Sequence, residues 1–171
     1  MKRKIIKNTA LGILVVLALI QFIHPEKNLG ESLGANDIQH VINVPEPVMR
    51  VLKTSCFDCH SNRTNYPWYN NIQPIAFWME DHVKEAKKEL NFSEFAGYTR
   101  KRQLKKMVEI GKEITEEEMP LPSYLIIHRD AVLTTEQAEL LKTWAEQSHA
   151  ELKSRPEESY KSDSTVIRAS N

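Results

Sequence analysis

Cysteine is scarce in this sequence of 171 residues. The two cysteines both fall within one short motif, Cys56-Phe57-Asp58-Cys59-His60. Cysteine chemistry elsewhere in the chain is therefore excluded, and any disulfide, thiolate or covalent attachment that uses cysteine has to involve this motif.

The chain also lacks a net charge, because 23 Lys and Arg residues balance 23 Asp and Glu residues. A neutral protein has no overall field that attracts phosphate backbones, so nucleic acid is not an expected partner. No internal repeat is visible, and no segment alternates in the manner of a β-strand. The length allows one compact domain with additional ends, so we predict a single all-α domain.

One long apolar stretch stands at the N-terminus. Lys2, Arg3, Lys4 and Lys7 precede the almost wholly apolar segment 11–20, an order typical of export signals. No Ala-x-Ala cleavage site follows, so we expect residues 1–23 to be an uncleaved single-pass membrane anchor, with a cleaved signal peptide as the alternative. The positive-inside rule then places the rest of the chain across the membrane, which in a bacterium means an inner-membrane protein with a periplasmic domain.

The remaining chain divides into three parts. Residues 24–44 contain glycine and asparagine without sustained apolar periodicity, which predicts a mobile linker. Residues 45–150 should form the helical domain. Residues 151–171 are polar, and we expect a disordered tail there.

Four helices are expected in the domain. They should begin near Pro45, cover 74–90, follow Thr99 and follow Thr134, which forms a capping-box pattern with Gln137. Apolar positions at helical spacing predict the faces that pack inward: Ile75, Trp78, Met79, His82, Val83, Ala86 and Leu90; Leu104, Met107, Val108 and Gly111; and Leu140, Leu141, Trp144 and Ala145.

The cysteine motif has the spacing Cys-x-x-Cys-His, the attachment pattern of c-type haem. On a helical turn, Cys56 and Cys59 project their sulfur atoms to one side, where both can form thioethers with the porphyrin vinyl groups. His60 then follows at the position of the proximal iron ligand. Such thioethers are made outside the cytoplasm, where the N-terminus directs the domain. The sequence thus predicts one covalently bound haem c.

Three alternatives compete with haem at this motif. A thioredoxin-type redox pair would need a strand and helix scaffold that is not expected here. A zinc site would need a fourth ligand, for which His40, His82, His128 or His149 are the candidates. A structural disulfide between such close cysteines would restrict almost no chain entropy.

The sixth coordination position of the iron is filled by Met, filled by His or left open. Met119 is our candidate, because it lies in the loop Met119-Pro120-Leu121-Pro122 and not on a helical apolar face. His82 and His128 are its rivals. Tyr66 and Trp68, in an aromatic loop, are candidates for the haem surroundings, although ordinary packing explains each of them equally well.

From Val44 to Ala150 the chain resembles a bacterial family of haem-binding domain proteins related to cytochrome c. The resemblance rests on residues 56–62, Tyr66-Pro67-Trp68-Tyr69, residues 91–93, Glu118-Met119-Pro120, residues 124–128 and the closing segment 141–145. It implies a cytochrome-c-like helical fold, thioethers at Cys56 and Cys59, His60 as the proximal ligand and Met119 as the distal ligand.

These features favour an electron-transfer module that carries one haem. A haem-based sensor or a peroxidase-like domain with an open distal site is the second hypothesis, and a non-haem metal-binding domain is the third. No constellation of acid, base or nucleophile stands apart from the cysteine motif, so we do not expect a dedicated enzyme.

Overall fold

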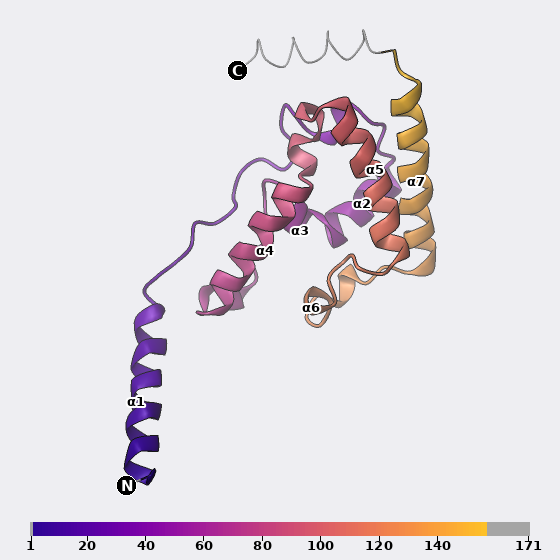
Figure 1. Ribbon diagram of the computed structural model, residues 1–171. Helices are drawn as coiled ribbons and strands as arrows, with labels where there is room; N and C mark the ends of the chain where they lie inside the picture. The colour runs from indigo at the N-terminus through magenta and orange to yellow at the C-terminus, as the bar shows by residue number, and fades with distance from the viewer. Residues whose placement is uncertain (1, 157–171) are drawn as a thin grey trace.

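Helices joined by loops make up the computed structural model, which describes residues 2–156 (Figure 1). The α-helices are α1 (Lys2–Ile20), α2 (Glu46–Ser55), α3 (Phe57–His60), α4 (Ile75–Glu89), α5 (Arg100–Thr115), α6 (Pro122–Leu125) and α7 (Thr135–Ser154). Four 3-10 turns join them: η1 (Ile38–His40), η2 (Trp68–Asn71), η3 (Phe92–Gly97) and η4 (Arg129–Ala131). The described residues contain no strand, which confirms the all-α prediction.

The helix boundaries follow the expected capping signals. Thr134 and Gln137 form the predicted capping box at the start of α7: the Gln137 amide donates to the Thr134 hydroxyl at 3.2 Å, and the Thr134 amide donates to the Gln137 side chain at 2.9 Å. Thr99 caps α5 in a similar way. These side chains satisfy amide groups that the first turn of a helix leaves without partners.

The hydrophobic core lies where α7 packs along α5 and also contacts α2. Its most deeply buried large side chains include Leu52, Phe92, Phe95, Met107 and Leu141. The indole of Trp144 donates to the Asn43 carbonyl at 3.1 Å and ties α7 to the start of the domain. The core thus joins the first and last helices of the domain.

The buried face of α5 differs from the predicted one at Val108. Val108 is 56% exposed, whereas Met107 and Gln103 are fully buried. Adjacent residues on a helix point about 100° apart, so a face centred on Met107 turns Val108 toward solvent. The buried polar group, Gln103, donates to the Phe95 carbonyl at 3.0 Å.

The prediction of a mobile linker over residues 24–44 is wrong for much of that segment. Ile38 and Ile42 belong to the hydrophobic core. Asn28 donates from its side chain to the Ser61 carbonyl and to the Thr64 hydroxyl, each at 2.9 Å. Isolated apolar residues and asparagines carry no periodicity, which explains why the sequence pattern did not indicate this packing.

The N-terminal helix α1 projects from the rest of the molecule (Figure 1) and has no buried residue. None of the helices in residues 2–156 combines the length and the apolar character that crossing a membrane requires.

At the other end of the chain, α7 continues to Ser154, so the predicted disordered tail does not begin at residue 151. Most of the expected tail, residues 157–171, lies outside the described residues.

Candidate functional site

The cysteine motif forms a tight turn directly after α2. The Cys56 amide still donates to the Leu52 carbonyl at 2.9 Å, and the Cys56 carbonyl then accepts the amides of Cys59 at 3.2 Å and His60 at 2.9 Å. This single turn, α3, brings Cys56, Cys59 and His60 to the wall of one cavity. The structure therefore places the three predicted motif residues together.

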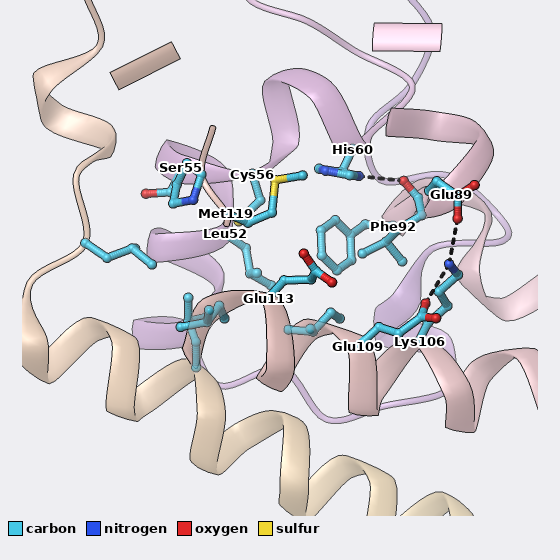
Figure 2. A pocket seen from close by; sticks show the side chains of 16 residues that line it. Leu52, Ser55, Cys56, His60, Glu89, Phe92, Lys106, Glu109, Glu113 and Met119 are labelled. Atoms are coloured by element: carbon cyan, nitrogen blue, oxygen red, sulfur yellow. Dashed lines mark hydrogen bonds and ion pairs between the residues drawn. The ribbon is translucent and has the colours of Figure 1, made fainter. Parts of the chain in front are cut away.

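Two neighbouring cavities share this wall. The larger, of about 470 Å³, lies among α3, η2, α4 and the α6 segment. The smaller, of about 310 Å³, lies between α2 and α5 (Figure 2). Five residues line both cavities: Ser55, Cys56, His60, Met119 and Pro120. Each cavity has the volume of a small-molecule site, and the motif lies between them.

His60 is held in one orientation by the end of α4. Its Nδ1–H donates to the Leu90 carbonyl at 2.9 Å, which leaves the lone pair on Nε2. Burial lowers the pKa of His60, although hydrogen bonds to the backbone oppose this shift. A neutral imidazole whose Nδ1–H is bound to a carbonyl is the usual state of a histidine that ligates a metal through Nε2.

Cys56 and Cys59 are half-buried and are not joined in a disulfide. Burial raises the pKa of Cys56 to about 12, with a contribution from Cys59, and it raises the pKa of Cys59 to about 11, with a contribution from Asp58. Both groups are therefore protonated thiols at neutral pH. Thioredoxin-type pairs have the opposite property, a lowered pKa.

The zinc alternative has no ligand set in the described part of the chain. There, no group of three or more His, Cys, Asp and Glu side chains is placed to hold a metal ion.

Met119 reaches the site because the chain turns back after α5. Glu117 adopts a left-handed conformation with φ of 56°, and the amides of Glu118 and Met119 both donate to the Glu113 carbonyl, at 3.0 and 3.3 Å. Met119 lines both cavities together with His60, as Figure 2 illustrates for the smaller one. The rival candidates His82 and His128 line the larger cavity but not the smaller one.

A hydrogen-bonded network joins the motif to the loop after Met119. The Tyr124 hydroxyl donates to Asp58 at 2.9 Å, and the Tyr124 ring stacks on His128 with centroids 4.0 Å apart. His128 Nε2 lies 2.6 Å from the Tyr69 hydroxyl. Sequence reasoning missed the roles of Asp58 and Tyr69; the position of Asp58 between the two cysteines was the one available signal.

A charged wall closes the smaller cavity along α5 (Figure 2). The nearly buried Lys106 ammonium pairs with Glu109 at 2.7 Å and with Glu89 at 3.2 Å. Burial alone would lower the pKa of Lys106, but the two carboxylates outweigh it and raise this pKa. Lys106 is therefore a permanent cation beside the cavity.

The two aromatic candidates have different positions. Trp68 lines the larger cavity. Tyr66 is not among the residues that line either cavity. Its hydroxyl accepts the Asn28 amide at 2.8 Å, and Lys27 lies over its ring. Tyr66 therefore serves to hold the N-terminal segment that was expected to be a free linker.

Comparison with known proteins gives one match. The family model of a haem-binding domain matches residues 15–147. No curated protein and no solved structure matches the chain. The matched range contains the cysteine motif, Met119 and all of the residues that line the two cavities.

Proposed function

The chain belongs to the haem-binding domain family, and on this premise we propose that it is a cytochrome-c-like carrier of single electrons with one covalently attached haem c. In this proposal Cys56 and Cys59 form the thioethers, His60 is the proximal iron ligand and Met119 is the distal ligand. The haem iron, when bound, supplies the exchange of one electron between its ferrous and ferric states.

The observation that carries the proposal is the state of His60 beside the two thiols. The Leu90 carbonyl fixes its tautomer and ring orientation, so Nε2 is available without reorganisation. Cys56 and Cys59 line the same cavity as His60 and are not consumed by a disulfide.

Met119 is favoured as the distal ligand because it alone among the three candidates lines both cavities with His60. A thioether ligand stabilises ferrous iron and raises the reduction potential, which suits electron transfer. If the distal position were open instead, the reduced protein would bind carbon monoxide rapidly, and the function of a sensor or a peroxidase-like module would replace that of an electron carrier.

The test of covalent attachment is the visible spectrum of the chain after export in cells that carry haem-maturation machinery. The protein is denatured in alkaline pyridine before the spectrum is recorded. We expect a c-type spectrum that stays with the polypeptide, because thioethers survive denaturation. A polypeptide that retains no haem would contradict the proposal, and metal analysis of the motif would then be the next measurement.

Tyr124→Phe is expected to weaken the attachment of the Met119 loop to the motif. The change removes the hydrogen bond to Asp58 but keeps the ring that stacks on His128. Hydrogen bonds to charged groups contribute about 1.5–3 kcal/mol, and because Tyr124 is only half-buried we expect a loss of about 1–2 kcal/mol.

Urea unfolding of the haem-loaded protein measures this loss. The red absorption band of methionine bound to ferric iron reports on Met119 at the same time, and it should weaken in Tyr124→Phe. Tyr98→Phe is the matched control, because its hydroxyl accepts the Asn91 amide away from Met119. An equal weakening of the band in both variants would contradict the role of Tyr124 in attaching the Met119 loop to the motif.

For the cellular location, we propose that α1 holds the haem domain at the periplasmic face of the bacterial inner membrane. Support comes from the apolar side chains of α1, none of which is buried, and from Lys2, Arg3, Lys4 and Lys7 at its start, which can pair with anionic headgroups. Haem-containing protein in the soluble periplasmic fraction, free of membranes, would contradict this location.

A further inference from the structure

Large apolar side chains gather at one edge of the domain without burial. We call this the apolar edge and define it by Phe22, Ile23, Trp68, Ile72, Ile126 and Ile127. Phe22 is 83% exposed, Trp68 76% and Ile126 67%. Ile72 and Ile126 line neither cavity, so a haem in the cavities would leave them exposed. Gathered apolar side chains at a surface usually mark a site of interaction.

Hydrogen bonds hold the parts of this edge together. Tyr69 in η2 is hydrogen-bonded to His128, which follows Ile127 directly. Figure 1 agrees: α6 and the start of α4, just after η2, both lie at the lower margin of the domain. The two apolar groups, at η2 and after α6, therefore adjoin the larger cavity, which Trp68 and Ile127 line.

The apolar helix α1 ends at this same edge. Gln21, one residue after α1, and Gln73, one residue after Ile72, exchange two hydrogen bonds: the Gln21 side chain donates to the Gln73 carbonyl at 3.1 Å and accepts the Gln73 amide at 2.9 Å. The Gln73 side chain also donates to the Ile23 carbonyl at 2.7 Å. Phe22 and Ile23 are thus fixed beside η2, and the exposed side chains of α1 continue the apolar edge.

The chemistry of this surface fits a lipid bilayer better than a protein groove. A helix that binds a protein partner presents one apolar stripe, whereas α1 exposes apolar residues around its whole circumference, including Leu11, Ile13, Leu14 and Val16. Tryptophan prefers the interface between hydrocarbon and headgroups. Trp68 lies on the part of this surface that belongs to the domain and not to α1. Lys27, hydrogen-bonded to Asn71 beside Ile72, is placed to contact anionic headgroups.

We infer that the apolar edge of the domain lies on the bilayer surface, with Trp68 and Ile126 at the depth of the lipid headgroups. The domain then does not hang from α1 on a free tether. It rests on the membrane in one orientation, and the larger cavity faces the lipid.

A photoreactive carbene precursor that partitions into the membrane tests this orientation. The full-length, haem-loaded protein is reconstituted in vesicles of phosphatidylethanolamine and phosphatidylglycerol, irradiated and mapped by mass spectrometry. Peptides that contain Trp68 and Ile126 should be labelled severalfold more than the peptide that contains Val108. Val108 is the matched control, since it is an exposed apolar residue on α5.

A double variant, Ile72→Ser with Ile126→Ser, separates the edge from the helix, because neither side chain lines a cavity. Labelling of the η2 and α6 peptides should fall toward the level at Val108, while labelling of α1 and the haem content stay unchanged. If α1 is labelled in the original protein but Trp68 and Ile126 are labelled no more than Val108, the inference is wrong. A second copy or a soluble protein that covers the edge would give this same result. The haem content, read from the pyridine spectrum, reports separately on the proposed function.

Discussion

Replacing both Cys56 and Cys59 with alanine is expected to abolish covalent haem. The two thiols line the cavity beside His60, and the motif holds the only cysteines of the chain, so no other side chain can form a thioether with the porphyrin. Haem that stays with the polypeptide after denaturation should fall to the background level. Any haem that the folded protein still holds through His60 should be extracted by acidic organic solvent.

Each single cysteine variant should give an intermediate result. One thioether keeps the haem attached, but the pyridine spectrum should shift toward that of haem with one unreacted vinyl group. Ser55→Ala is the matched control, because Ser55 is the neighbour of Cys56 and lines both cavities. Full covalent haem in the double variant would contradict the assignment of the motif, and lost haem in Ser55→Ala would point to a general folding defect.

Replacing Met119 with leucine is expected to lower the reduction potential. Leucine fills nearly the same volume but has no sulfur lone pair, so ferrous iron loses the ligand that stabilises it. Axial ligands set haem potentials over a range of about 0.8 V, and we expect a fall on the order of 100 mV. The vacated position should then bind carbon monoxide rapidly in the reduced protein.

Met79→Leu provides the comparison for this variant. Met79 also lines the larger cavity, but it lies on α4 and does not line the smaller cavity with His60. Redox titration of Met79→Leu should give a potential close to that of the original protein. A potential that is unchanged in Met119→Leu would assign the distal position to another group, with His82 and His128 as the next candidates.

Spacing along the sequence was sufficient to predict those features that depend on neighbouring residues. The Cys-x-x-Cys-His motif closes within one turn of backbone hydrogen bonds, so its geometry follows from its own residues. The capping box at Thr134 and Gln137 is equally local. The face of α4 was also predicted as a stripe, although it lines the larger cavity instead of the hydrophobic core.

Features that depend on distant residues could not be predicted in this way. The partner of His60 is the Leu90 carbonyl, and every residue has a carbonyl, so no side-chain pattern indicates it. Asp58 and Tyr124 lie 66 residues apart. The packing of Asn28 against the loop after the motif likewise needs the folded chain, and this contact was the reason that the linker prediction failed.

The helix α4 connects two features at its opposite ends. Its first residue, Ile75, stands close to the apolar edge, and Leu90, the residue after its last turn, holds His60. A helix rises about 1.5 Å per residue, so these 15 residues span about 22 Å. With the edge on the bilayer, α4 sets an upper limit of about 22 Å on the height of the imidazole above the lipid. Redox partners with short extramembrane domains would then be able to approach the haem. Partners with tall extramembrane domains would contact the side of the molecule that faces away from the membrane.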